Sequence, residues 1–258
     1  MTQRRSDLDR FTDRVTDYIA YRPSYPGELL QFFQQELGLT RKHAVADVGS
    51  GTGILAELFL ENGNTVYGVE PNQAMREAAE VLLVDYDRFH SVAGTAEATK
   101  LEVGLVDFVV AGQSFHWFDP QAARTEFRRI LGSGGWVALV WNSRRTKGTH
   151  FSTAYEAFLR RWGTEYREIS GRYGAKGPLI PFFSSAPFER RSFPNRQIFD
   201  HAGLRGRLLS SSYIPGPDDA AYQPMLEALR ELFDDQEQGG VVVMEYDTEV
   251  FFGRLDGE

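Results

Sequence analysis

The stretch VADVGSGTGI, residues 45–54, decides how this chain is expected to fold. An apolar run ends in three glycines at alternate positions, and an amphipathic run begins at Ile54 immediately after them. This order predicts a buried strand, a tight turn and a helix, because glycine accepts the backbone angles of a sharp turn and has no Cβ to obstruct a ligand. The start of the helix also offers unpaired backbone N–H groups to a polar or negative group.

A second apolar run, residues 65–69, leads into Glu70, which stands 17 residues after Gly53. In a strand–helix–strand unit this spacing places a carboxylate beside the glycine turn, at the position where a ribose diol binds. A carboxylate accepts hydrogen bonds from two adjacent hydroxyl groups, so the two features together predict a nucleoside site. The alternative to a nucleoside site is an ordinary strand–helix turn, which would have to explain three glycines within five residues.

The pattern Asp47-x-Gly49-x-Gly51-x-Gly53 distinguishes two kinds of nucleoside ligand. The dinucleotide pattern G-x-G-x-x-G needs a third glycine where this chain has Ile54. An acid inside the end of the first strand suits a cation and would repel a pyrophosphate. The pattern resembles motif I of the class I S-adenosylmethionine-dependent methyltransferases, whose ligand carries an amino acid and a sulfonium.

The resemblance covers roughly residues 40–142 and includes three further stretches. Residues 21–26 (YRPSYP), 113–118 (QSFHWF) and 210–215 (SSSYIP) are similar to the methyltransferase type 11 and trans-aconitate methyltransferase-like group. This resemblance implies an α/β, Rossmann-like fold with a seven-stranded, mostly parallel sheet in the order 3-2-1-4-5-7-6, the last strand antiparallel and helices on both faces. It also implies S-adenosyl-L-methionine as cofactor, bound across the ends of strands one, two and four.

Hydrophobic periodicity and turn residues predict the individual elements. Strands are expected at 43–48, 65–69, 88–92, 105–111, 136–142, 188–198 and 241–252, with Pro194 interrupting the sixth. Helices are expected at 29–39, from 54, at 72–83, at 120–131 with Gly132 ending it, and at 150–168, 200–209 and 217–233. Residues 170–187 are expected to form a loop.

The chain is expected to form a single methyltransferase domain, residues 1–258. Within it, 1–39 would be an arm and helix forming part of a lid, and 40–142 the cofactor-binding core. Residues 143–215 would be a substrate-cap insertion, and 216–258 would supply the helix and final strand that complete the sheet.

The resemblance implies which residues bind the cofactor. The loop 94–98 would face the adenine, with Thr95 at a position where the family often has aspartate. The predicted cofactor-binding residues are Asp47, Gly49, Ser50, Gly51, Thr52, Gly53, Glu70, Pro71, Thr95, Ala96, Glu97, Gln113, Phe115, Tyr21 and Arg22.

The acceptor site is predicted from residues outside the cofactor motif. The predicted acceptor-binding residues are Tyr25, His116, Trp117, Arg144 and Arg145. His116 is the candidate catalytic base, with pairing to the cofactor's carboxylate or a purely structural role as alternatives. An arginine would bind a carboxylate acceptor in a bidentate manner, and a solvated arginine pair is the alternative. For Trp117, as for any single aromatic side chain, ordinary core packing is the alternative.

Composition limits the other functions. The chain has 258 residues, a net charge of −8 and no cysteine. The acidic balance disfavours nucleic acid and anionic membranes as partners. The lack of cysteine excludes disulfides and thiolate sites, and the histidines show no ligand spacing, so no metal is expected. No apolar run reaches the length of a membrane span, so we expect a soluble, cytoplasmic protein, monomeric or homodimeric.

Three functions remain in competition. The leading hypothesis is an S-adenosylmethionine-dependent methyltransferase acting on a small molecule, with a carboxylate as one candidate acceptor. The second is a non-catalytic protein that binds the cofactor without turnover. The third is a nicotinamide-dependent oxidoreductase, against which Ile54 in the third glycine position argues.

Overall fold

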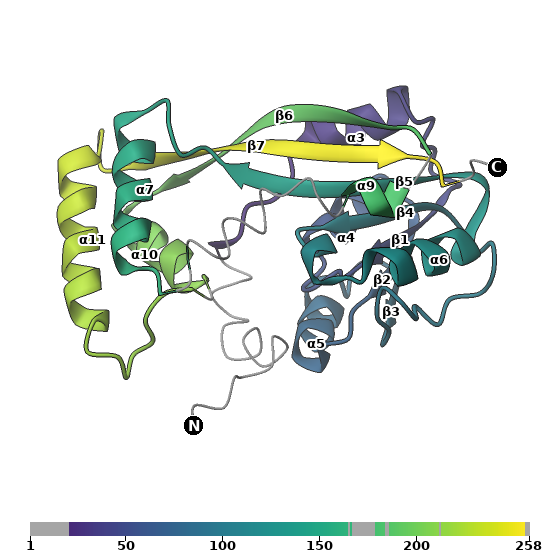
Figure 1. The fold of residues 1–258 in the computed structure, drawn as a ribbon, viewed down its shortest axis with the longest axis horizontal. Coiled ribbons are helices and arrows are strands. Elements are labelled where there is room, and N and C mark those ends of the chain that lie inside the picture. The colour runs from purple at the N-terminus through teal and green to yellow at the C-terminus, as the bar shows by residue number, and fades with distance from the viewer. Residues whose placement is uncertain (1–20, 165, 167–178, 184–185, 212, 256–258) are drawn as a thin grey trace. The chain divides into compact units, whose positions relative to one another are not determined.

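The computed structural model describes residues 21–164, 166, 179–183, 186–211 and 213–255 (Figure 1). Its strands form one seven-stranded sheet in the order β3-β2-β1-β4-β5-β7-β6, which confirms the predicted order. The strands are β1 (Ala44–Val48), β2 (Thr65–Val69), β3 (Phe89–Val92), β4 (Val106–Gly112), β5 (Leu131–Arg144), β6 (Phe188–Phe199) and β7 (Val242–Gly253). The first five pair in parallel, and Figure 1 shows β7 running opposite to β5.

The chain divides into two compact units. The sheet unit comprises the described parts of Ser24–Asn142, Lys176–Phe193 and Thr248–Glu258. The helix unit comprises the described parts of Met1–Pro23, Ser143–Ala175 and Pro194–Asp247. Three of the five boundaries between the units fall inside β5, β6 and β7.

The sheet unit is built on strands that are buried on both faces. Ala46 and Val48 of β1 belong to one core cluster and Val45 to the other, because successive side chains of a strand point to opposite faces. The first cluster packs against α6 (Pro120–Ile130) and α9 (Leu179–Phe183), the second against α3 (Gly27–Gln35) and α4 (Ile54–Glu61). Burial on both faces explains why the parallel strands read as continuous apolar runs.

The helix unit has a separate apolar core. It is formed by α7 (His150–Trp162), α10 (His201–Leu209), α11 (Tyr222–Gln236) and the first half of β7. Tyr155 and Phe158 of α7 stack at a ring separation of 6.0 Å, and the buried Tyr246 projects from β7. Among the described residues, no helix is both long enough and apolar enough to cross a membrane.

Two sequence predictions were wrong, one because of burial and one because of position at the sheet edge. Residues 179–183, predicted as loop, form α9, and its Leu179, Phe182 and Phe183 are buried against the sheet. The strand β6 runs unbroken through Pro194. Proline is tolerated there because β6 is the edge strand of the sheet and needs no ladder partner on its outer side.

Other differences concern where elements begin and end. Helix α7 ends at Trp162, with Gly163 as its C-cap, not at 168. Helix α6 ends at Ile130, and β5 begins at once at Leu131, five residues before the predicted start. Gly132 therefore lies in the strand and does not end the helix. Helix α3 ends at Gln35 and α11 begins at Tyr222, so both are shorter than predicted.

Parts of the predicted lid lie outside the described residues. These are residues 1–20 of the arm, residues 165, 167–178 and 184–185 of the insertion, and residue 212 within the 210–215 stretch.

Candidate functional site

The glycine turn after β1 places two glycines against side chains and one against open space. Gly49, Gly51 and Gly53 all have positive φ, at 68°, 57° and 87°. A Cβ on Gly49 would lie 2.6 Å from the Ser114 Cβ, and one on Gly53 would lie 2.6 Å from a methyl carbon of Leu83. A Cβ on Gly51 would meet no atom within 4 Å. The turn is thus packed at its two ends and open at its centre.

Glu70 is held beside this turn by two backbone N–H groups. It follows β2 directly, and its Oε2 accepts from the Gly51 N–H at 3.0 Å. Its Oε1 accepts from the Asn72 N–H at 2.9 Å. Burial raises the pKa of Glu70, and the N–H groups of Asn72 and Gly51, with the charge of Arg76, oppose that rise. A carboxylate has about four acceptor positions, so about two remain for a ligand.

Asp47 is a buried carboxylate that lacks a hydrogen-bond partner. It lies on β1 with 1% of its surface exposed, and neither oxygen is hydrogen-bonded by any described residue. Burial raises the pKa of Asp47 to about 7, and the Glu70 charge adds to the rise. The Ala56 N–H opposes it without reaching hydrogen-bond geometry. The hydroxyl of Thr52 in the adjacent turn is also buried without a partner. Orphaned polar groups of this kind fit a cationic or hydrogen-bonding ligand.

The loop after β3 is closed on itself. The Thr95 N–H donates to the Ala98 carbonyl at 3.1 Å, and the Ala98 N–H donates back at 3.2 Å. The Glu97 carboxylate accepts from the N–H of Asp119, the N-cap of α6, at 2.9 Å. Ala96 is buried and Thr95 is exposed. The Thr95 backbone N–H is therefore already in use, which leaves its side chain for a ligand.

The segment after β4 begins with a strained residue. Gln113 has a φ of 58°, a conformation that costs a side-chain-bearing residue roughly 1–2 kcal/mol. Its N–H donates to the Val140 carbonyl at 2.9 Å, and its side chain donates to the Asn142 carbonyl at 3.2 Å. Ser114 donates to the Val48 carbonyl at 2.9 Å and so ties this segment to the end of β1.

The three residues of the short 3-10 helix, Phe115–Trp117, have different surroundings. Phe115 is buried in edge-to-face contact with Trp141 and Phe182. His116 is partly buried with its ring 4.7 Å from that of Trp117, which is 39% exposed. Phe115 thus packs in the core of the sheet unit and Trp117 is exposed, whereas both ring nitrogens of His116 are buried.

Residues at the start of the sheet unit contact the carboxyl ends of β4 and β5. The Tyr25 hydroxyl lies against Gly112, where a Cβ would come within 2.5 Å of it. The Asn142 side chain donates to the Ser24 carbonyl at 3.2 Å and accepts from the Thr248 hydroxyl at 2.6 Å. Asn142 thus joins residues far apart in the chain, a role that sequence analysis missed because its partners are not sequence neighbours.

The remaining predicted residues belong to the helix unit. The Tyr21 ring packs directly on Gly206, and Arg22 donates to the Ser210 carbonyl at 3.0 Å. Arg144 is paired with Glu156 at 2.6 Å. Arg145 is paired with Asp247 at 2.7 Å.

The helix unit contains a buried cation that the sequence did not indicate. Arg207, in the last turn of α10, is 8% exposed. Its nitrogens lie 3.4 Å from the Tyr246 hydroxyl, 3.3 Å from Ser210 Oγ and 3.2 Å from Ser211 Oγ. Among the described residues no carboxylate forms an ion pair with it. A basic residue in the last turn of a helix is ordinary, so only its burial reveals it.

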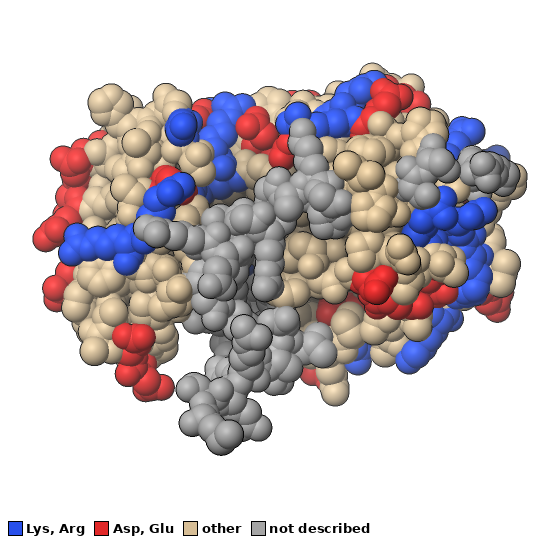
Figure 2. Space-filling model, viewed as in Figure 1, with Lys and Arg blue, Asp and Glu red and all other residues tan. Residues whose placement is uncertain are grey.

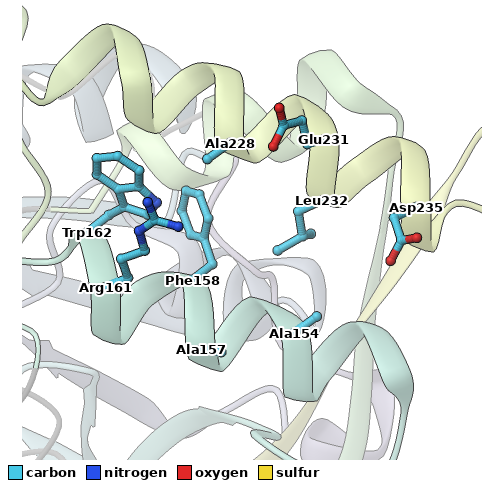
Figure 3. A pocket seen from close by; sticks show the side chains of 9 residues that line it. All are labelled: Ala154, Ala157, Phe158, Arg161, Trp162, Ala228, Glu231, Leu232 and Asp235. Carbon is cyan, nitrogen blue, oxygen red and sulfur yellow. The ribbon is translucent and has the colours of Figure 1, made fainter.

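A separate pocket of about 430 Å³ lies between α7 and α11 (Figure 3). Phe158 and Trp162 line it from α7, with Arg161 over the Trp162 ring at 4.9 Å, and Glu231 and Asp235 line it from α11. It contains none of the residues predicted from the sequence.

Comparisons with known proteins agree with this geometry. Residues 46–139 match the family model of the methyltransferase domain. An uncharacterized methyltransferase of Mycobacterium tuberculosis is 34% identical over 175 residues, which are 67% of this chain and 64% of that protein. An uncharacterized methyltransferase-like protein of Schizosaccharomyces pombe is 32% identical over 139 residues, 54% of this chain and 53% of that protein. The chain thus spans less than two thirds of the length of these relatives.

Solved structures share the fold. A putative type II methyltransferase from Anaeromyxobacter dehalogenans aligns with a TM-score of 0.68 at 22% identity, covering 92% of this chain and 99% of that one. A putative S-adenosyl-L-methionine-dependent methyltransferase from Methanococcus maripaludis aligns with a TM-score of 0.57 at 21% identity, covering 74% of this chain and 91% of that one. At these identities the likeness establishes the fold alone.

The glycine turn generates a prediction on stability with a matched pair of variants. Gly51→Ala should lower the free energy of unfolding by about 1–2 kcal/mol, the usual cost of a left-handed alanine. Gly49→Ala carries the same cost and adds an overlap with Ser114, typically worth about 1–3 kcal/mol more. Urea denaturation of both variants measures the difference. Equal stability of the two would contradict the packing described for Gly49.

Asp47 generates a prediction on pH dependence. Because its pKa is higher in the folded than in the unfolded chain, its ionisation destabilises the folded state, and stability falls as the pH rises from about 4 to about 7. At about 1.36 kcal/mol per pKa unit, the rise from 3.8 to about 7 is worth roughly 4 kcal/mol at most. Asp47→Asn should therefore unfold at a higher temperature than the unmodified protein at pH 8, with the gap closing toward pH 4. A gap independent of pH would count against a buried, unpaired Asp47.

Proposed function

We propose that this chain, which contains a methyltransferase domain of the class I, S-adenosylmethionine-dependent family, transfers a methyl group to a small-molecule acceptor, with a carboxylate as the favoured acceptor group. The observation that carries the proposal is the glycine turn with Glu70 held beside it. Gly51 faces open space, and its N–H and that of Asn72 orient the carboxylate. The domain match over residues 46–139 supports S-adenosylmethionine as the cofactor.

The residues of the sheet unit fit this cofactor. The unused acceptor positions of Glu70 suit the two ribose hydroxyls, and Gly51 leaves room for the nucleoside to approach. Asp47, buried without a hydrogen-bond partner, suits the positive charge of the ligand's amino or sulfonium group. We assign the adenine to the loop at 95–97, where Thr95 contributes its side chain because Ala98 occupies its N–H. Tyr21, Arg22, Gln113 and Phe115 remain part of this proposal.

The chain's own contribution to the reaction is alignment and exclusion of water. S-adenosylmethionine supplies a methyl group on a sulfonium, and the leaving group is a neutral thioether, so no residue needs to stabilise a leaving anion. Holding an acceptor in line with the methyl group removes much of the entropic cost of the transfer. An ionised carboxylate acceptor needs no general base, whereas a hydroxyl, amine or carbon acid does.

We assign acceptor binding to residues 143–215 and the N-terminal arm. This follows the expected arrangement, in which residues 40–142 bind the cofactor, 143–215 and the N-terminal arm cover the acceptor, and 216–258 complete the sheet of one methyltransferase domain. Figure 2 supports a small acceptor over nucleic acid, because acidic and basic side chains are interspersed over the described part of the face shown. The net charge of −8 supports the same choice.

Glu70→Ala tests the cofactor assignment. Loss of charge-assisted hydrogen bonds to the ribose should weaken S-adenosylhomocysteine binding by about 1.5–3 kcal/mol, roughly 10- to 150-fold. Isothermal titration calorimetry measures it, with Glu80→Ala on the exposed face of α5 (Gln73–Leu82) as the control. Circular dichroism verifies that the variant is folded. Unchanged affinity in folded Glu70→Ala protein would remove the basis of the assignment.

His116→Ala distinguishes the classes of acceptor. If the acceptor is a carboxylate, turnover should fall only modestly, because no proton has to be removed. The measurement is S-adenosylhomocysteine production with a panel of small acids, alcohols and amines, alongside cofactor affinity by calorimetry. Abolished turnover with intact cofactor binding would point to an acceptor that needs a base and would contradict the carboxylate assignment.

A further inference from the structure

Among the described residues, no carboxylate forms an ion pair with the buried Arg207 of the helix unit. Its contacts are three hydroxyl groups at 3.2–3.4 Å, from Tyr246, Ser210 and Ser211. Charge-assisted hydrogen bonds of a guanidinium are shorter, about 2.7–2.9 Å. Buried charges are normally paired with an opposite charge, and no described residue supplies one to Arg207, which is 8% exposed.

The partly buried Arg144 of the same unit provides the comparison. Arg144 forms a 2.6 Å ion pair with Glu156, and the Tyr166 hydroxyl lies 2.9 Å from the same guanidinium nitrogen. The surface Arg145 is likewise paired, with Asp247. Among the described residues, Arg207 has the tyrosine and serine hydroxyls of such an arrangement but not its carboxylate.

The groups around Arg207 are held in place. The Tyr246 hydroxyl donates to Gln197 Oε1 at 2.7 Å, and Gln197 in turn donates to the Tyr21 carbonyl at 3.2 Å. Arg22 binds the carbonyl of the same Ser210 whose hydroxyl contacts Arg207. Two guanidinium groups therefore contact one serine. The buried Tyr155 also interacts electrostatically with Arg207, and its ring adds apolar surface.

A purely structural role for Arg207 explains less. The C-terminus of α10 favours a cation, but a helix end compensates only a small part of the cost of removing a guanidinium from water. Long contacts to neutral hydroxyls add little to this. A ligand that brings its own negative charge would complete the arrangement, as Glu156 does for Arg144.

We propose that Arg207 is the anchor for the carboxylate of a small, partly apolar ligand bound within the helix unit. Identification of that ligand as the methyl acceptor rests on the proposed function. Arg207 then takes the anchoring role that the sequence suggested for Arg144 and Arg145, whose charges are already matched within the unit.

The test uses the full-length protein and a pair of probes that differ in charge. Benzoate carries a carboxylate on an aromatic ring, and benzamide is its neutral counterpart of nearly the same shape. Thermal unfolding is followed with each probe at equal ionic strength, adjusted with sodium chloride. We expect benzoate to raise the unfolding temperature in a saturable manner and benzamide to leave it unchanged, because a ligand stabilises the state that it binds.

Three variants assign the effect to Arg207. Arg207→Met should weaken benzoate binding at least about tenfold, and Arg207→Lys should retain part of it, since lysine keeps the charge but loses the two-pronged geometry. Arg230→Met, at an exposed arginine of α11 paired with Asp234, should respond as the unmodified protein does. If Arg207→Met does not fold, Arg207→Lys and the benzoate–benzamide comparison still decide the question.

Several results would overturn the proposal. These are equal responses to benzoate and benzamide, a benzoate response that persists in Arg207→Met, or no response to benzoate in the unmodified protein. S-adenosylhomocysteine titration of the same samples keeps the two proposals apart. Cofactor binding without a benzoate response removes the anchor alone, whereas a benzoate response without cofactor binding removes the proposed function and leaves an anion site.

Discussion

The two hydrogen bonds that backbone N–H groups donate to Glu70 are the constraint on which the candidate site depends. One comes from Gly51 in the turn after β1, and the other comes from Asn72, the N-cap of α5. Each hydrogen bond to a charged group contributes about 1.5–3 kcal/mol. Burial nevertheless keeps the pKa of Glu70 above its ordinary value, so its desolvation outweighs what the two bonds and Arg76 return. This carboxylate is thus placed at a cost to stability, as is usual for groups whose purpose is to bind.

The same pattern recurs around the glycine turn. Asp47 is buried beside Glu70, with a raised pKa and no hydrogen-bond partner among the described residues. Gln113 holds a left-handed backbone conformation, anchored at both its backbone and its side chain. Strained and unsatisfied groups are tolerated where surrounding structure fixes them, and they gather at functional sites. Three such groups, Asp47, Glu70 and Gln113, converge on the ends of β1, β2 and β4.

The resemblance predicted the order of the sheet strands, and the sequence predicted that Glu70 lies beside the glycine turn. The glycines and the position of Glu70 predicted a carboxylate beside the turn, because a strand–helix–strand unit has a nearly fixed geometry. The surroundings of the arginines were not predictable in this way. Arg145 pairs with Asp247, which lies 102 residues away in the sequence. Whether Arg207 is buried depends on how α10 packs. The same limit explains α9 and the passage of β6 through Pro194, where burial and edge position decided the structure. Local patterns carry information about local geometry, and charge pairing is a property of the assembled fold.

The three strands that run through both units have a consequence for how the protein can change. Many enzymes acquire new specificity by exchanging a module joined through flexible linkers, but here three of the boundaries between the units fall within β5, β6 and β7. Recombination that replaced the helix unit would have to rejoin three strands in register, and a shift of one residue would turn every side chain to the opposite face. We therefore expect related proteins to diverge by point substitutions within the helix unit, while the pairing of these three strands is kept.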